Sequence, residues 1–290
     1  MIQLDVAHKK FIDKLQTLGR SSSTLVAYGK DIEQLLEYLS KSGVNTVNEA
    51  RLEHLEGFMK KLSDEGYTNK SISRKTNSTK TFFKYLLEEG HIEKVVSEDL
   101  KHPKVAVKAP RILSRLEYRA LRDAARDDVR SSAIVEVLLQ TGVTISELAG
   151  MKVEHLLLDS KTLYIPKRNA KETRTVPLND AVISSLRAYL EKGRISQRPS
   201  EYVFITKTGN PLLVRNIRST IDRYFRLAGV EKAKVNDLRH TFLAHHLTQG
   251  VSLGFLSKVV GHKRISTTER YLDYVERDEN MTEKSELGEL

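Results

Sequence analysis

Four short segments in the second half of the chain contain residue types that could act on an anionic substrate. They supply arginine, lysine and histidine, which can bind or protonate an oxyanion, and tyrosine, whose hydroxyl can attack as a nucleophile. Taken singly, each side chain could be an ordinary surface, turn or core residue, so the ordered set is what suggests a site. The segments are TGVTISEL (141–148), NAKETRTVPL (169–178), NDLRHTF (236–242) and VVGHKRISTTERYLDY (259–274).

The histidines and the absence of cysteine narrow the chemistry further. His240, His245, His246 and His262 match no zinc spacing, and no acidic ligand lies between them in a metal-binding pattern. The chain has no cysteine, which excludes disulfides, thiolate metal sites and cysteine nucleophiles. We therefore expect neither a metal nor another cofactor.

Length and charge favour a two-domain protein with a polyanionic partner. The 290 residues are enough for two modest domains, and Lys plus Arg exceed Asp plus Glu by 48 to 38, a net charge of +10. The N-terminal stretch MIQLDVAHKKFIDKL lacks the apolar core of a signal peptide, and no window approaches a membrane span. These features predict a soluble, cytoplasmic protein that does not bind a membrane.

Helical periodicity dominates the first third of the chain. Apolar residues recur at helical spacing in three segments, and the run SSST at 21–24 is typical of a helix start. A fourth helix is predicted to begin near Asn69 and to end at Gly90. The first three apolar faces are Phe11, Ile12, Leu15 and Leu18; Leu25, Tyr28, Ile32, Leu35, Leu36 and Leu39; and Leu52, Leu55, Phe58, Met59 and Leu62.

The fourth helix has two distinct sides. At about 100 degrees per residue, one side gathers residues suited to packing, whereas the other is polar and basic and could lie along phosphates. A solvated face of an ordinary amphipathic helix is the alternative interpretation, and Lys75 fits neither side. The packing side is Ile72, Thr76, Thr79, Phe82, Phe83 and Leu86, and the basic side is Lys70, Arg74, Asn77 and Lys84, with Lys80 at its edge.

A basic, proline-containing segment precedes a second, differently patterned region. SEDLKHPKVAVKAPRIL, residues 97–113, has two prolines and four basic residues and reads as a linker. Helices are then predicted over 114–126 and 130–141, followed by about three antiparallel strands within 153–178, with a turn at 159–161. Helices resume at residues 180, 214 and 236. The predicted divisions are 1–96, a helical domain; 97–113, the linker; 114–274, a second domain that contains the four segments; and 275–290, a tail.

Together, in this order and at this spacing, the four segments resemble the catalytic domain of the tyrosine recombinases, also called phage-integrase-type recombinases. The chain as a whole is similar to the Xer branch. The resemblance implies a mostly α-helical fold with a small antiparallel sheet, in which a SAM-like core-binding domain and a catalytic domain form a C-shaped clamp on DNA. It also implies cleavage and rejoining of DNA through a 3′-phosphotyrosyl intermediate, which needs neither ATP nor metal because the covalent step conserves the bond energy.

The resemblance assigns a role to each matching residue. Tyr271 is the nucleophile, with Tyr274 as the nearest rival. Arg239 and His262 bind the nonbridging phosphate oxygens, where charge gathers during transfer. Lys171 protonates the leaving 5′-oxygen, although Lys167 is an alternative because Lys171 lies six rather than five residues before Pro177. His240 either orients Arg239 or contacts DNA.

Two positions depart from the family's sequence. The family carries an arginine in the pattern TGxRxSEL, and it usually carries a histidine or lysine two residues before the leucine of LRH. Thr144 replaces the first arginine, and Asn236 replaces the histidine or lysine. Threonine carries no charge and an amide cannot transfer a proton at neutral pH, so impaired cleavage is expected. Three explanations stay open: a natural loss of efficient cleavage, an active enzyme in which Arg168 or Lys152 fills the gap, or an introduced substitution at Thr144.

The family resemblance also implies partners. Double-stranded DNA is the expected substrate, bound mainly through phosphates, with base readers also expected on the helix that begins near Val214: Arg215, Asn216 and Arg218. A homo-tetramer on two DNA sites, with tail exchange between protomers, is expected, and a partner recombinase is an open alternative. The reaction would serve chromosome or plasmid dimer resolution or a mobile element. A cleavage-poor DNA-binding relative, or a nicking activity like that of type IB topoisomerases, are the competing functions.

Overall fold

The computed structural model describes residues 2–166, 173–276 and 284–290. The chain divides into two compact units, Met1–Lys108 (unit 1) and Ala109–Leu290 (unit 2). Each unit buries a hydrophobic core of its own. In the part of the chain described here, no helix has both the length and the apolar character needed to cross a membrane.

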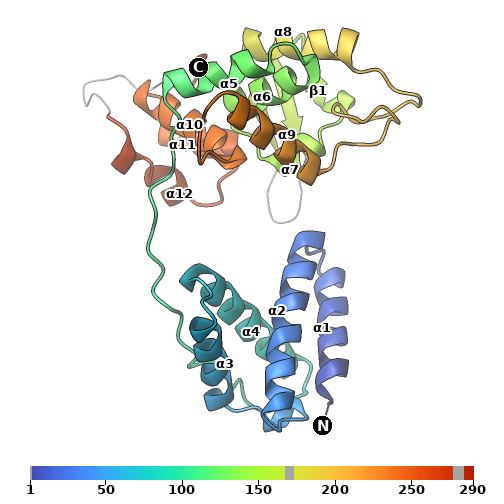
Figure 1. The fold of residues 1–290 in the computed structure, drawn as a ribbon, viewed down its shortest axis with the longest axis vertical. Coiled ribbons are helices and arrows are strands. Elements are labelled where there is room, and N and C mark those ends of the chain that lie inside the picture. Colours follow the sequence, from blue (N-terminus) through green and yellow to red (C-terminus); the bar gives the residue numbers. More distant parts are fainter. Residues whose placement is uncertain (1, 167–172, 277–283) are drawn as a thin grey trace. The chain divides into compact units, whose positions relative to one another are not determined.

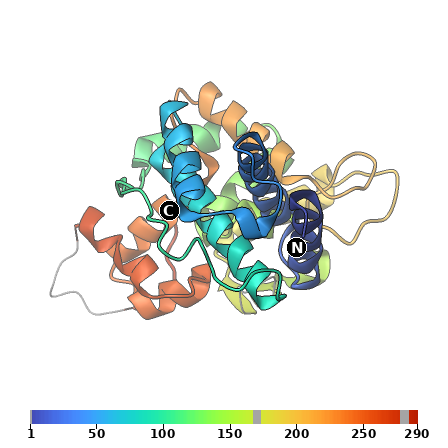
Figure 2. The ribbon, with the colours of Figure 1, turned by 90° about the horizontal axis from the view of Figure 1, so that it is seen from below.

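Unit 1 is a helical bundle (Figures 1 and 2) in which the second helix begins at the predicted SSST run and the fourth begins at Asn69 and ends two residues before Gly90. Ser21 accepts a hydrogen bond from the backbone N–H of Thr24 at 3.2 Å, which explains why the SSST run starts a helix. Phe11, Leu35 and Phe82 are each almost fully buried in the common core. The helices are α1 (Leu4–Thr17), α2 (Ser22–Lys41), α3 (Leu52–Asp64) and α4 (Asn69–Glu88), with a 3₁₀ turn at Val47–Glu49.

Unit 2 is mostly helical, with a three-stranded antiparallel sheet in its described residues, as predicted. Strand β2 (Thr162–Ile165) lies between β1 (Leu156–Leu157) and β3 (Arg174–Pro177). Leu163 and Ile165 are buried, whereas Tyr164 between them is exposed, so one face of the sheet covers the core. Lys161 adopts a left-handed φ of 52° in the predicted turn between β1 and β2.

The helices of unit 2 surround α6, which is buried along most of its length. Helix α6 (Val129–Thr141) contacts α5 (Arg115–Ala125), α8 (Asp180–Ala188), α9 (Val214–Leu227) and α10 (Val235–Thr248). The short helix α7 (Ile145–Ala149) follows it. The prediction of helix from residue 236 onward was too coarse, because Gly250 and Gly261 interrupt it with left-handed φ values. The remaining elements are a π-helical turn at Tyr189–Gly193, 3₁₀ turns at Val153–His155 and Leu272–Tyr274, α11 (Leu253–Val260) and α12 (Ser266–Glu269).

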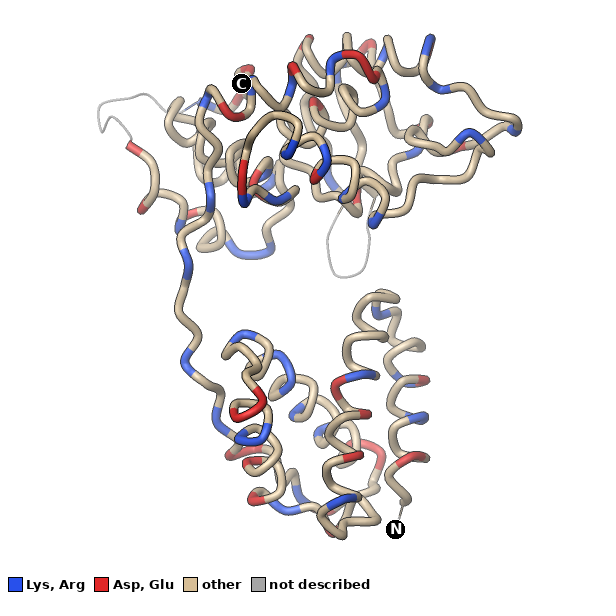
Figure 3. Tube along the Cα trace, in the orientation of Figure 1, with Lys and Arg blue, Asp and Glu red and all other residues tan. Residues whose placement is uncertain are grey.

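The segment predicted as a linker is anchored near both of its ends. Near the start, Lys80 Nζ donates to the Glu98 carbonyl at 3.0 Å and Asn69 Nδ2 donates to the Lys104 carbonyl at 2.9 Å, both from α4. Near its end, the backbone N–H of Leu113 donates to Thr241 Oγ1 in unit 2 at 2.8 Å. Residues 105–112 lie between these anchors, and Val107 among them is 79% exposed. Lys and Arg recur along this segment (Figure 3).

The last described residues fold back onto unit 2. Leu290 is buried, its backbone N–H donates to Gln140 Oε1 at 3.0 Å, and its carbonyl accepts from Arg122 Nη1 at 2.8 Å. Lys284 pairs with Val251 in a short parallel bridge. Residues 277–283, which connect these contacts to the body of unit 2, lie outside the described residues.

Candidate active site

Thr144 is the N-cap residue of the short helix α7. The chain leaves α6 through Gly142, whose φ is 61°, and enters α7 with Thr144 as its N-cap. Thr144 Oγ1 accepts the backbone N–H of Glu147 at 3.3 Å, and the backbone N–H of Thr144 donates to Glu147 Oε2 at 2.8 Å. This reciprocal pair is a capping box. The threonine side chain therefore stabilises the start of α7 and supplies no charge.

Replacement of Gly142 should greatly reduce the stability of unit 2. Its left-handed φ is strained for other residues, and an added Cβ would lie 2.5 Å from Cδ1 of Phe242. We expect Gly142→Ala to lower the free energy of unfolding of unit 2 by about 2 to 5 kcal/mol, the sum of strain and overpacking. Urea unfolding followed by tyrosine fluorescence measures it.

Gly229→Ala is the matched control for Gly142→Ala. Gly229 has a similar φ of 67°, but nothing lies within 4 Å of an added Cβ. This variant should lose only the strain contribution, about 1 to 2 kcal/mol. Equal losses in the two variants would contradict the close contact with Phe242.

A buried ion pair connects three elements around this turn. Arg174 on β3 donates from Nη1 and Nη2 to the two carboxylate oxygens of Glu147, at 2.9 and 3.0 Å. Its Nε donates to the carbonyl of Val259 on α11 at 2.7 Å. Both side chains of the pair are less than a tenth exposed. Arg174 thus fixes α7, β3 and the end of α11 relative to one another.

Arg239 lies buried beside this ion pair. Its guanidinium donates to the Gly142 carbonyl and, at 2.7 Å, to the Val260 carbonyl. Burial lowers the pKa of Arg239 to about 10; Glu147 opposes this shift and Arg174 adds to it. The guanidinium still carries its proton at neutral pH. The predicted phosphate-binding arginine is therefore a cation held by two backbone carbonyls.

The predicted nucleophile belongs to a chain of three hydrogen-bonded side chains. Tyr271 is 4% exposed, and its Oη lies 2.5 Å from Nδ1 of His240. On the other side of the imidazole, Asn236 Nδ2 donates to Nε2 of His240 at 2.8 Å. Because Nε2 accepts that bond, the proton of neutral His240 lies on Nδ1 and points at the tyrosine oxygen. This arrangement would stabilise a phenolate.

The pKa shifts in this chain of side chains follow from burial. Burial raises the pKa of the Tyr271 hydroxyl, against the opposing influence of Arg239 and Arg270. Burial also lowers the pKa of His240, which Asp237 partly offsets. His240 is therefore neutral at physiological pH. Tyr274, the rival nucleophile, is 37% exposed, and the tyrosine that is hydrogen-bonded to His240 in the described structure is Tyr271.

A cavity of about 430 Å³ brings several predicted residues together. Thr144, Asn236 and Arg239 line it, as does Arg218, which was predicted only as a DNA contact. Lys234, which was not predicted from the sequence, also lines this cavity. With Asp222, the lining has three cationic side chains and one carboxylate, so it suits an anion. The other lining residues are Leu138, Val143, Ile145 and Val235.

His262 lies in the loop after α11, at a second cavity. Its Nδ1 is 2.8 Å from Thr268 Oγ1, and the cavity of about 780 Å³ is also lined by Arg174, Lys258 and Lys263. The preceding residue, Gly261, has a φ of 70° and lies against the Arg174 guanidinium. Arg174 therefore contacts both the surroundings of His262 and, through Glu147, the capping box of Thr144.

Three of the cations proposed from the sequence lie outside the described residues, and a fourth makes a contact elsewhere. Lys171, its alternative Lys167, and Arg168 lie outside the described residues. Lys152, the other substitute considered for the missing arginine, pairs with Glu201 at 2.9 Å and does not line the cavity beside Thr144. Arg218 and Lys234 do line it.

The predicted DNA-contacting residues are exposed on two helices. On α4, Lys70, Arg74, Asn77 and Lys84 are exposed, whereas Lys80 is half-buried and donates to a backbone carbonyl. Lys84 also pairs with Glu88 at 3.8 Å. Lys75 is buried, which explains why it fitted neither side of the helix. The exposed residues on the first turns of α9 are Arg215, Asn216 and Arg218.

The sequence is similar to those of known recombinases. Residues 110–277 match the model of the phage integrase family, and residues 9–90 match that of the phage integrase N-terminal SAM-like domain. Tyrosine recombinase XerD of Proteus mirabilis is 30% identical over 92% of this chain and 88% of its own length. Tyrosine recombinase XerC of Bacillus pumilus is 28% identical over 90% of this chain and 89% of its own.

A solved structure extends the likeness to the fold. A lambda integrase dimer bound to a COC′ core site has a TM-score of 0.73 at 18% identity, and the match covers 99% of this chain and 81% of the integrase.

Proposed function

The chain belongs to the phage integrase family of tyrosine recombinases, and from that membership we propose that it cleaves and rejoins DNA at specific sites through Tyr271. One observation supports the residue assignment most directly. Asn236 lines the cationic cavity with Arg239 and also reaches the Tyr271 hydroxyl through His240. The nucleophile and an anion-binding cavity are thus parts of one hydrogen-bonded arrangement.

In the proposed reaction, Tyr271 Oη bonds to phosphorus as the bond from phosphorus to the 5′-oxygen breaks. The leaving oxygen takes a proton from Lys171 or Lys167, and the freed 5′-hydroxyl later attacks a partner strand. Arg239 and His262 stabilise the nonbridging oxygens, where the negative charge is greatest. The proton of the Tyr271 hydroxyl passes to solvent water, and the Nδ1–H of His240 stabilises the phenolate oxygen that attacks.

Cleavage should be slower than in a site that has the full pair of arginines. Thr144 contributes a helix cap in place of a cation, and Asn236 contributes an amide in place of an ionisable group. Besides Arg239, Arg218 and Lys234 are the described cations that line the cavity beside Thr144, and we assign them a partial replacement of the missing charge. Both are exposed, so solvent weakens their effect.

A covalent-trapping experiment tests this function. Duplexes that bind the protein are selected from a library with a randomised core, and a nick is placed within the selected sequence so that the cleaved end is lost. A protein–DNA adduct that survives denaturant supports the recombinase. Selective binding without any adduct supports the second candidate, a DNA-binding partner at recombination sites, which the uncharged Thr144 favours. The absence of selective binding contradicts both.

The proposed assembly is a homo-tetramer on two duplexes, alone or with a partner recombinase, acting on cytoplasmic DNA in dimer resolution or for a mobile element. Binding should come from both units, through α4 and α9. Tail exchange between protomers requires residues 284–290 to leave the contacts that they make with Gln140 and Arg122 in the same unit. Assembly on DNA would therefore replace contacts within a chain by the same contacts between chains.

A further inference from the structure

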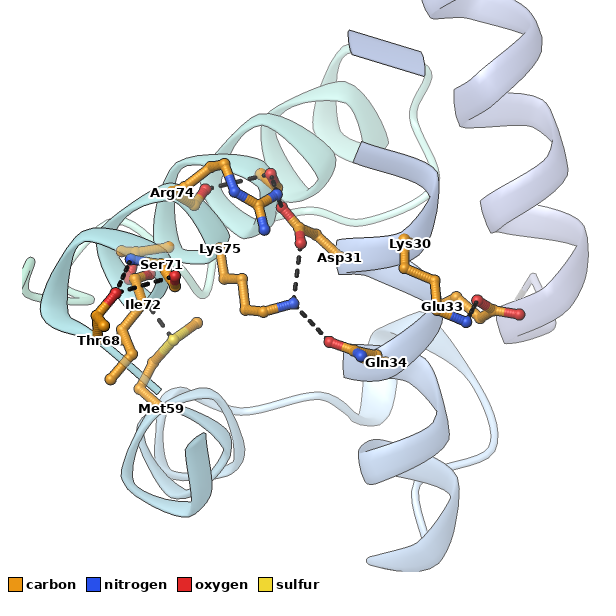
Figure 4. Close-up of polar contacts among 12 residues, drawn as sticks. Lys30, Asp31, Glu33, Gln34, Met59, Thr68, Ser71, Ile72, Arg74 and Lys75 are labelled. Carbon is orange, nitrogen blue, oxygen red and sulfur yellow. Dashed lines mark hydrogen bonds and ion pairs between the residues drawn. The ribbon is translucent and has the colours of Figure 1, made fainter. Parts of the chain in front are cut away.

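Arg74 differs from the other cations on the exposed side of α4, because a buried carboxylate holds its guanidinium. Arg74 Nη1 donates to Oδ2 of Asp31 on α2. The Asp31 side chain is 2% exposed, whereas that of Arg74 is 47% exposed. Figure 4 shows the two side chains meeting between the helices. In the described structure, the guanidinium makes no other hydrogen bond, so Nη2 and Nε are available to a ligand.

Asp31 is itself fixed on both of its oxygens. Lys75 Nζ, on a side chain that is 4% exposed, donates to Oδ1 at 2.9 Å, and Ser78 Oγ donates to Oδ2 at 2.8 Å. Lys75 also donates to Gln34 Oε1 (Figure 4). These two hydrogen bonds hold the Asp31 carboxylate in place even when the Arg74 side chain changes conformation. With two cations against one anion, the cluster keeps a surplus positive charge on its exposed member, Arg74.

Stability alone is a poor explanation for this cluster. The free energy lost when buried ions are desolvated is about as large as the free energy gained from their attraction. Apolar residues of similar volume would therefore hold two helices together at least as well. A fixed arginine, however, loses less conformational entropy when it binds, and its planar donors keep one direction. A phosphate can accept hydrogen bonds from an arginine in many orientations. Two hydrogen bonds to the edge of one base require the guanidinium to have one particular orientation.

We propose that Asp31 is a positioning residue that holds Arg74 for direct readout of a guanine in the recognised DNA site. This inference rests on the proposed function and adds a specificity determinant to it. Arg74 would donate two hydrogen bonds to O6 and N7 of one guanine. Lys75 neutralises Asp31 from the protein interior, which leaves the charge of Arg74 for DNA. Lys84, which is exposed on the same side of α4, would contact phosphate.

Selection from the randomised duplex library, repeated with variants of the full chain, tests the proposal. Arg74→Lys keeps the charge and removes the planar fork. Asp31→Asn combined with Lys75→Met removes the positioning carboxylate without leaving a buried lysine unpaired. Both should lose discrimination at the same G·C pair by roughly 5- to 100-fold, while affinity for unselected DNA changes little. Circular dichroism verifies that each variant is folded.

Lys84→Ala is the matched control. It should weaken binding to all sequences alike and reduce the slope of log affinity against log salt by about 0.9. If Arg74→Lys keeps the full preference of the native protein, Arg74 does not read a base and the proposal is wrong; this arm decides even if the double variant does not fold. If the native protein selects no sequence, the proposed site-specific function itself fails.

Discussion

Replacing Thr144 with arginine should raise the rate of strand cleavage by about 100- to 1,000-fold. A guanidinium at this position would enter the cavity that Arg239 lines, where the developing phosphorane carries its charge. The expected gain corresponds to one restored donor, about 3 to 4 kcal/mol of transition-state stabilisation. The rate of adduct formation on the nicked duplex, measured under single-turnover conditions, gives the value directly.

The same substitution should lower stability. Arginine cannot accept the Glu147 N–H as Thr144 Oγ1 does, so the cap of α7 is lost at about 1 kcal/mol. Thr144→Ala is therefore the control: it loses the same cap and adds no charge, and its cleavage rate should stay near that of the native protein. A folded Thr144→Arg protein with an unchanged rate would mean that Arg218 and Lys234 already supply the charge and that cleavage is not impaired.

Replacing Tyr271 with phenylalanine should abolish the covalent adduct and leave DNA binding intact. Phenylalanine keeps the buried ring and removes the oxygen that must bond to phosphorus. Loss of the hydrogen bond with His240 should lower the free energy of unfolding by only about 1 kcal/mol, so the variant should remain folded. Denaturing gels report the adduct, and fluorescence anisotropy with the same duplex reports binding.

Tyr274→Phe provides the comparison for Tyr271→Phe. Tyr274 follows three residues later and is 37% exposed, in contrast to the buried Tyr271. Its substitution should change neither adduct formation nor binding. The opposite pattern, with the adduct lost only in Tyr274→Phe, would transfer the nucleophile to Tyr274 and contradict the proposed arrangement around His240.

Local sequence patterns predicted most of the elements. The SSST cap, the helical spacing of Phe11 and Leu15, and the turn before Thr162 each depend on residues close together in the chain, and each is confirmed. The capping box of Thr144 was also visible, as threonine followed by glutamate three residues later. It was missed because the position was considered only as the place of a missing arginine.

Contacts between distant residues could not be predicted in the same way. Lys75 fitted neither side of its helix because its partner, Asp31, lies 44 residues earlier on α2. The pairing of Arg174 with Glu147 and the presence of Lys234 on the wall beside Thr144 likewise depend on how helices and strands pack. No periodicity in one segment contains that information. Thus local sequence patterns identified candidate reactive residues but not the residues that hold them in place.

The segment between the two units is held at both of its ends, so it acts as a short tether between unit 1 and unit 2. Hydrogen bonds hold Lys104 to unit 1 and Leu113 to unit 2, so residues 105–112 are all that lies between the two anchors. Eight fully extended residues span only about 27 Å. If both units bind DNA as proposed, a duplex bound by one unit therefore meets the other at an effective concentration on the order of millimolar. Two individually weak DNA contacts can in this way give one long-lived complex.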